Sequence, residues 1–273
     1  METPFQPFDP DGNGNGGRGP RLREIPLRLI IPNLVTVLAI CAGLSGIRLA
    51  FEGRFETAVA MVLLAAFLDA MDGRVARRLK ATSQFGAQMD SLADVVNFGV
   101  APALVLYAYL LDIARPAGWI AALVFVVAAA LRLARFNVMA EKPGKAKWQA
   151  DYFIGVPAPA AAVLVMLPVY LGFLGIEATK TFAMIGVIFT LAMAFLMISR
   201  LPVFSGKSSA TAVRRDWVVP VILLVVVYVL FLTTYTWETM TFSAVAYLCF
   251  LPFSAWMFQK RLEKEEEADK EHN

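Results

Sequence analysis

Long apolar stretches separated by short polar segments make up most of the 273-residue chain. Each stretch is close to the length of about 20 apolar residues that an α-helix needs to cross a bilayer. The pattern predicts eight transmembrane helices, at about residues 29–50, 57–78, 86–111, 117–137, 154–174, 181–199, 216–234 and 239–258. Prolines interrupt the fifth and the last of them, which membrane helices tolerate when neighbours satisfy the freed carbonyl groups. We therefore expect an all-α polytopic membrane protein.

The two ends of the chain are polar. Residues 1–20 are rich in Gly, Pro, Asn and Asp, a composition that cannot bury a core, so we expect this segment to be disordered. It has no apolar run followed by a small-residue cleavage site, which argues against a secretory signal. Residues 21–258 are expected to form the membrane domain, and residues 259–273 a charged tail.

Lys and Arg residues are distributed unevenly between the predicted connections. Most of the 25 fall at the N-terminus, at every second connection and in the C-terminal tail. Only Arg48, Arg54, Arg115 and Lys180 fall on the other side. Because positively charged loops stay in the cytoplasm, this bias predicts that both termini are cytoplasmic, and an even number of helices agrees with it.

Composition excludes several classes of function. The chain is 58% hydrophobic, more than a soluble domain of this size needs. Its only histidine is His272, and Cys41 and Cys249 stand alone in apolar runs. We therefore expect neither histidine-based catalysis nor a zinc site of the His/Cys kind. We expect no nucleic-acid partner.

Four aspartates interrupt the apolar pattern of the second and third predicted helices. Asp69 and Asp72 are three residues apart, and Asp90 and Asp94 are four apart, so each pair shares one helix face. Carboxylates at membrane depth need a partner, and four acids without a matching inward cluster of bases favour hard divalent cations. A turn near residues 80–86 would bring the four together, and four carboxylates can hold two ions for phosphoryl transfer.

A simpler interpretation of these acids is two solvated helix ends. In that case the carboxylates would pair with nearby basic residues, namely Arg74, Arg77, Arg78 and Lys80. Four acids in one array with interleaved glycines favour the cation site over this alternative.

The spacing of the whole stretch is D-x2-D-G-x2-A-R-x8-G-x3-D-x3-D. Its fixed positions are filled by Asp69, Asp72, Gly73, Ala76, Arg77, Gly86, Asp90 and Asp94. This resembles the signature of the CDP-alcohol phosphotransferases, integral membrane enzymes of phospholipid synthesis. The resemblance implies two divalent metals, Mg²⁺ or Mn²⁺, bound by the four aspartates, with Asp94 also the general base on the acceptor hydroxyl.

The same resemblance implies a site for the nucleotide of a CDP-linked lipid. Gly73, Ala76 and Arg77 would line the cytidine and phosphate pocket, and Gly86 would allow close packing beside the nucleotide. A P-N-x-x-T element opens the first predicted helix, and Asn33 and Thr36 are expected in the cytidine site. An interfacial turn at a helix start is the alternative for this element.

Three further stretches resemble the bacterial phosphatidylserine synthases of this superfamily. They are R-L-A-R-F-N at residues 132–137, F-x-G-x-P-x-P at 153–159 and L-A-D-V-V-N-F-G-V-A-P at 92–102. This resemblance implies CDP-diacylglycerol as donor and L-serine as acceptor, giving phosphatidylserine and CMP. It also implies a homodimer that is integral to the bacterial cytoplasmic membrane and contacts membrane lipids. The active site would face the cytoplasm.

Candidate acceptor contacts come from the same stretches. Arg132 and Arg135 could hold the lipid phosphate or the serine carboxylate, because arginines within an apolar helix are costly unless they face anions. Snorkelling cytoplasmic anchors are the alternative. Asn97 and Asn137 are expected to make polar contacts with the acceptor.

Two other functions stay open. Another acceptor, such as glycerol 3-phosphate, inositol phosphate or choline, would use the same acidic site. A cation transporter would use intramembrane acids to carry ions, but such proteins often show internal repeats and acids at the membrane midplane. The two halves of this chain show no clear repeat, and its acids cluster at one predicted membrane face.

Overall fold

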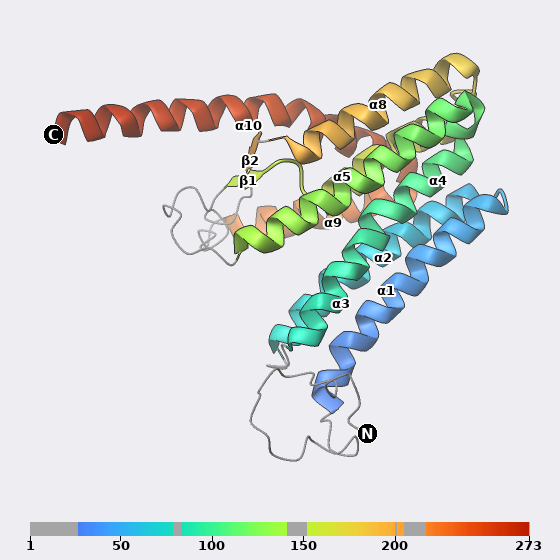
Figure 1. Ribbon diagram of the computed structural model, residues 1–273, viewed down its shortest axis with the longest axis horizontal. Coiled ribbons are helices and arrows are strands. Elements are labelled where there is room, and N and C mark those ends of the chain that lie inside the picture. The colour runs from blue at the N-terminus through green and yellow to red at the C-terminus, as the bar shows by residue number, and fades with distance from the viewer. Residues whose placement is uncertain (1–26, 79–82, 141–151, 200, 205–216, 273) are drawn as a thin grey trace, which may run out of the picture. The chain divides into compact units, whose positions relative to one another are not determined.

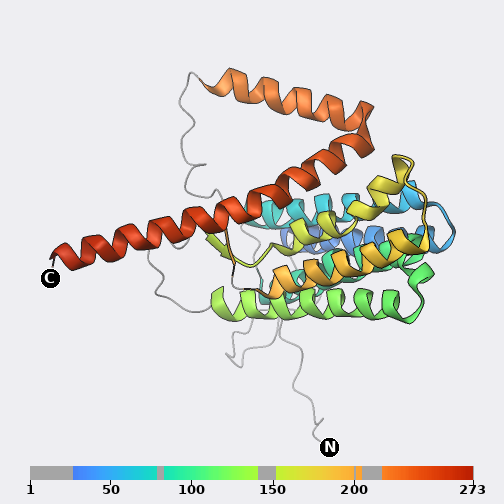
Figure 2. The same ribbon diagram turned by 90° about the horizontal axis from the view of Figure 1, so that it is seen from above.

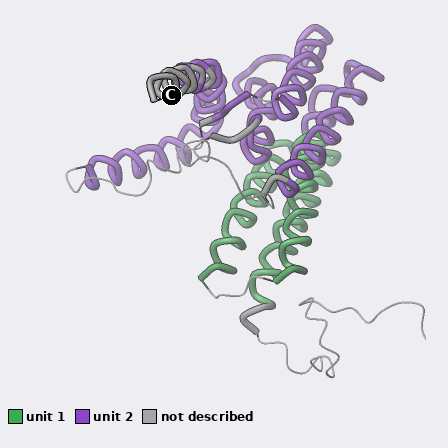
Figure 3. Tube along the Cα trace, turned by 60° about the vertical axis from the view of Figure 1, so that its left-hand side comes forward, with its two compact units in different colours: residues 1–105 green, residues 106–273 purple. Residues whose placement is uncertain are grey.

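The computed structural model describes residues 27–78, 83–140, 152–199, 201–204 and 217–272. The chain divides into two compact units, residues 1–105 and 106–273, which are coloured separately in Figure 3. The described residues are almost entirely helical, as the sequence predicts, with one short pair of strands in addition. The predicted N-terminal segment 1–20 lies outside the described residues.

The first unit begins with a helical hairpin, α1 (Leu27–Phe51) and α2 (Phe55–Arg78), whose helices run side by side (Figure 1). The turn between them contains Gly53 at φ +77°, in the left-handed region that glycine enters without steric cost. Small side chains face each other along the hairpin. A Cβ atom at Gly46 of α1 would lie 3.0 Å from the Ala58 carbonyl oxygen of α2. Small residues thus let the two backbones approach closely, as is common between membrane helices.

The third helical stretch of this unit changes its pitch along its length. It runs as α3 (Gln84–Asp94), a π-helical turn η2 (Val95–Val100) and α4 (Ala101–Tyr109). Ser83 caps its start, since its hydroxyl accepts a hydrogen bond of 3.0 Å from the Gly86 backbone N–H. The π-helical turn directly follows Asp94, so it affects where the last acid of the array points.

The second unit contains further apolar helices and a two-stranded sheet. Its elements are η3 (Leu111–Ala114), α5 (Pro116–Ala140), β1 (Tyr152–Ile154), α6 (Ala158–Val165), α7 (Leu167–Phe173), α8 (Lys180–Ile198), β2 (Pro202–Phe204), α9 (Val218–Thr234) and α10 (Thr236–His272). Helices α5 and α8 pack side by side. The predicted span 154–174 is broken into α6 and α7 just before Pro168, whose ring and missing N–H disfavour an uninterrupted helix.

The last two helices follow each other across a sharp bend, as Figure 2 shows. The Tyr228 and Ser243 hydroxyl groups lie 3.1 Å apart and connect α9 to α10. At the start of α10, the Trp237 ring centroid lies 4.4 Å from that of Phe173 on α7. This aromatic contact attaches the beginning of α10 to α7. Helix α10 then continues past residue 258 into the charged C-terminal stretch.

Five of the described helical stretches are long and apolar enough to cross a membrane: 30–51, 84–109, 116–138, 180–198 and 236–258. Two shorter apolar stretches, 158–173 and 218–234, lie where the fifth and seventh spans were predicted. Helix α2 occupies the predicted second span, but Asp69, Asp72 and the arginines of its last turns lower its hydropathy. The chain is therefore a polytopic membrane protein, while the number of eight spans stays a prediction.

Candidate active site

Three of the four aspartates converge where α2 and α3 lie close together. One carboxylate oxygen each from Asp69, Asp72 and Asp90 lies within 4.8 Å of the others. The carboxyl group of Asp94 lies within hydrogen-bonding range of that of Asp69. Three of the four expected acids therefore form a cluster in the first unit, with Asp94 beside Asp69.

This donor set fits a divalent cation. All of its ligand atoms are carboxylate oxygens, which Mg²⁺, Mn²⁺ and Ca²⁺ prefer. Within the described part of the chain, Oδ1 of Asp69 is buried without a hydrogen-bond partner, as expected for an atom available to a cation. Among the described residues, no Lys or Arg lies within 4.0 Å of the carboxylates of Asp69, Asp72 or Asp90, so ion pairing with bases does not neutralise these three acids.

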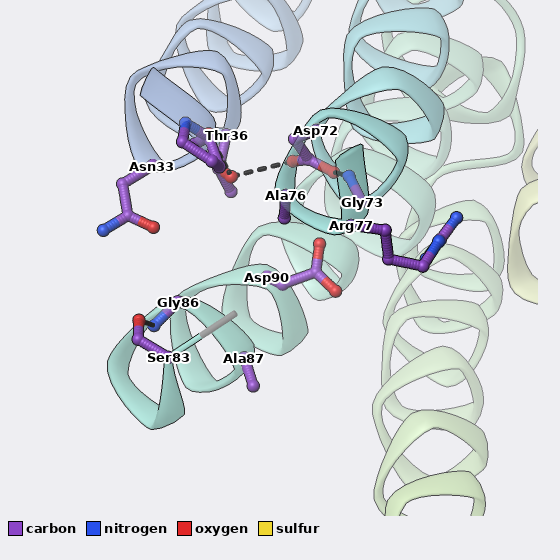
Figure 4. Close-up of a pocket in the computed structure, with 11 residues that line it drawn as sticks. Asn33, Thr36, Asp72, Gly73, Ala76, Arg77, Ser83, Gly86, Ala87 and Asp90 are labelled. Carbon is purple, nitrogen blue, oxygen red and sulfur yellow. Dashed lines mark hydrogen bonds between the residues drawn. The ribbon is translucent and has the colours of Figure 1, made fainter. Parts of the chain in front are cut away.

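Asp72 is held in place by hydrogen bonds from two sides (Figure 4). Its Oδ2 accepts a bond of 2.7 Å from the Thr36 hydroxyl of α1, and its Oδ1 accepts one of 2.5 Å from the Gly73 backbone N–H. Only 3% of Asp72 is exposed. Thr36 thereby connects the P-N-x-x-T element to the acidic array.

A cleft of about 190 Å³ opens beside these acids. All six residues expected at the nucleotide line it: Asn33, Thr36, Gly73, Ala76, Arg77 and Gly86. Asp72 and Asp90 line the same cleft, so the acids and the expected nucleotide residues share one site (Figure 4). The structure thus brings fixed positions of the motif together in a single concave surface formed by residues of α1, α2 and α3.

Three further residues line the cleft that the sequence did not predict there: Pro32, Ser83 and Ala87. Ser83 could have been found, because a serine directly before an apolar helix is a common N-cap. Glycine at position 86 keeps this wall of the cleft tight. A Cβ atom there would lie 3.0 Å from Oδ1 of Asn33 and 3.1 Å from Oγ of Ser83.

The expected acceptor residues fall in both units. Asn97 is fully buried in the first unit. Arg132, Arg135 and Asn137 belong to α5 in the second unit, where Asn137 is exposed. Nη1 of Arg135 donates a hydrogen bond of 3.0 Å to the Ile198 carbonyl oxygen at the end of α8, so Arg135 caps that helix.

The F-x-G-x-P-x-P stretch meets the end of the same helix. Strand β1 pairs antiparallel with β2, with Phe153 opposite Val203. Gly155 follows at φ +76°, and its N–H donates a bond of 2.8 Å to the Leu201 carbonyl oxygen. Two stretches that are distant in sequence, R-L-A-R-F-N and F-x-G-x-P-x-P, are therefore joined around the C-terminus of α8.

The fold and the site define the class of protein. It is a helical membrane protein with a carboxylate cluster beside a cleft that small residues line in part. The chain belongs to the CDP-alcohol phosphatidyltransferase family, whose model matches residues 29–198. A second model, CDP-alcohol phosphatidyltransferase 2, matches residues 216–252, over α9 and the first part of α10.

Several curated relatives cover most of the chain. A CDP-diacylglycerol–serine O-phosphatidyltransferase of Mycobacterium leprae is 38% identical over 86% of this chain and 77% of its own length. One of Mycobacterium tuberculosis is 35% identical over 91% of this chain and 85% of its own length. An archaetidylserine synthase of Methanothermobacter thermautotrophicus is 34% identical over 70% of this chain and 77% of its own length.

Proposed function

We propose that the chain transfers the phosphatidyl group of CDP-diacylglycerol to the hydroxyl group of L-serine, giving phosphatidylserine and CMP. The observation that carries the proposal is the cluster of Asp69, Asp72 and Asp90 in the cleft that the family motif lines. Similarity to relatives named for transfer to serine, over most of the chain, supports serine as the acceptor.

In this proposal the acids and the cleft have separate tasks. Asp69, Asp72, Asp90 and Asp94 would hold two divalent cations, Mg²⁺ or Mn²⁺. Bound there, the cations offset the charge of the diphosphate and of the departing CMP. Asn33, Thr36, Gly73, Ala76, Arg77 and Gly86 would bind the nucleotide part of the donor, with the Arg77 guanidinium suited to phosphate oxygens.

The transfer itself needs one proton acceptor. Asp94 would take the proton of the serine hydroxyl as the serine oxygen forms its bond to the lipid phosphorus. The bond from that phosphorus to the bridging oxygen of the diphosphate breaks, and CMP leaves with the electron pair. A carboxylate within hydrogen-bond reach of the hydroxyl suffices for this step, so the absence of a catalytic histidine is no obstacle.

The serine carboxylate needs a cation, a role for Arg132 or Arg135 of α5 in this proposal. Arg135 also donates a hydrogen bond to the Ile198 carbonyl oxygen at the end of α8. Asn137, an exposed residue near the end of the same helix, would add a polar contact to the acceptor. The distribution of Lys and Arg supports a cytoplasmic active site in the bacterial inner membrane, and the family resemblance supports a homodimer.

The test is CMP release by the purified protein with CDP-diacylglycerol and Mg²⁺ or Mn²⁺. L-serine, glycerol 3-phosphate, inositol phosphate and choline would be compared as acceptors. We expect release with serine that a chelator abolishes and added metal restores. CMP release with another acceptor but not with serine would refute serine as the substrate. Metal-dependent cation transport without any CMP release would favour a transporter.

A further inference from the structure

Asn97 has a buried side-chain amide without a hydrogen-bond partner among the residues that the structure describes. None of its surface is exposed, and neither Nδ2 nor Oδ1 has a hydrogen-bond partner. An amide offers two donors and an acceptor oxygen, and leaving them unmade in the interior costs stability. Buried polar groups without protein partners are commonly satisfied by ordered water molecules.

The backbone around Asn97 is also unusual. Asn97 lies in the π-helical turn η2, a local widening of the helix that recurs at functional sites. Asp94 precedes it by three residues on the same continuous helix. The two residues are therefore separated by less than one turn along this helix.

Helix α1 leaves space for this side chain. A Cβ atom at Gly43 would lie 2.6 Å from Oδ1 of Asn97, so only glycine fits there without displacing the amide. Gly43 follows Thr36 by two helical turns, about 10 Å along the same face of α1. Because Thr36 donates a hydrogen bond to Asp72, the acidic cluster and the Asn97 amide contact the same face of α1.

We propose that Asn97 is a positioning residue, whose amide holds an ordered water molecule that hydrogen-bonds to the Asp94 carboxyl group and fixes its orientation. The inference rests on the proposed function, in which Asp94 takes the proton of the acceptor. It replaces the direct acceptor contact expected from the sequence, because a side chain without exposed surface does not touch a substrate.

Two substitutions of Asn97 separate hydrogen bonding from volume. Asn97→Leu keeps much of the volume but removes every polar atom, and we expect kcat to fall about 10- to 100-fold with both KM values within about twofold of wild type. Asn97→Ser keeps a hydroxyl and leaves space for water, so its kcat should stay within about fivefold of wild type. Cys41→Ala, at an exposed position of α1, is the control and should change nothing.

A double substitution separates positioning from packing. Gly43→Ala alone should lower both the thermal midpoint and kcat, because its methyl group displaces the amide. In Gly43→Ala/Asn97→Ala the truncated side chain leaves space for that methyl group. We expect the thermal midpoint to return to near the wild-type value while kcat stays low.

Three results would overturn the positioning role. They are wild-type kcat in Asn97→Leu, an increase confined to the KM for the acceptor, or recovery of kcat together with the thermal midpoint in the double variant. Each ratio is measured against the wild-type protein with whichever acceptor supports CMP release. Lack of serine-dependent release by the wild-type protein would instead count against the proposed function.

Discussion

Asp72 is the acid that the surrounding residues restrain most. It is almost fully buried, and each of its carboxylate oxygens accepts a hydrogen bond, one from the Thr36 hydroxyl of α1 and one from the Gly73 backbone N–H of its own helix. Groups that orient a metal ligand in this way affect metal affinity nearly as strongly as the ligands themselves. Thr36 is therefore expected to matter through Asp72 as well as through the nucleotide.

Thr36→Val removes that hydroxyl with little change in volume. We expect the concentration of Mn²⁺ or Mg²⁺ that gives half-maximal CMP release to rise about 10- to 100-fold, because Asp72 loses its orienting bond. Ser45→Ala, at an exposed position of the same helix, provides the matched control. An unchanged metal requirement in Thr36→Val would show that the hydrogen bond does not orient a ligand.

Asp94→Asn tests the assignment of the proton acceptor. An amide is close to a carboxylate in shape but cannot take a proton from the acceptor, so kcat should fall at least about 100-fold. Binding of CDP-diacylglycerol, measured by calorimetry, should persist because the nucleotide residues are unchanged. Turnover above about a tenth of wild type would exclude Asp94 as the base.

The sequence predicts the site better than it predicts the local environment of each residue. The fixed spacing of the acids and glycines places them on two adjacent helix faces, and the cleft contains all six expected nucleotide residues. Two contacts in the structure join residues that are far apart in the sequence. Thr36 and Asp72 are separated by 36 positions, and Arg135 and Ile198 by 63. Spacing along one helix carries no information about such contacts.

At the scale of elements, the apolar runs predict nearly every helix, and the deviations have local causes. The strands β1 and β2 have three residues each, too short for an alternating pattern to be recognised. A π-helical turn such as η2 has almost the same apolar spacing as an α-helix over six residues. Prolines indicated an interruption in the fifth span, but not where α6 would end and α7 begin.

Gly155→Ala tests the junction between β1 and the end of α8. Gly155 has φ +76°, and a Cβ atom there would overlap the Met197 carbonyl oxygen. Gly175 has φ +102° with open space around it, so Gly175→Ala has backbone strain of about 1–2 kcal/mol without a clash. We expect Gly155→Ala to lower the thermal midpoint clearly more than Gly175→Ala does.

Equal midpoints for the two alanine variants would mean that backbone strain alone accounts for the effect at position 155. In that case the close contact with α8 would contribute little to stability. A specific defect in activity at an unchanged midpoint would also contradict a purely structural junction.

At the scale of the whole molecule, the uneven distribution of Lys and Arg predicts how the chain crosses the membrane. Cysteine labelling in intact cells tests it in a protein that lacks Cys41 and Cys249. We expect a membrane-impermeant maleimide to label Lys180→Cys in intact cells, and Lys270→Cys only after the membrane is permeabilised. Labelling of Lys270→Cys in intact cells would place the C-terminus, and with it the predicted active site, on the outer side.

The central claim is that the serine oxygen attacks the lipid phosphorus and that CMP departs. Reaction with L-serine labelled with ¹⁸O in its hydroxyl group, followed by mass spectrometry of both products, tests it most directly. The account predicts that phosphatidylserine retains the label and that CMP is unlabelled, in equal molar amounts and only with divalent metal present. Unlabelled phosphatidylserine, or label in CMP, would contradict it.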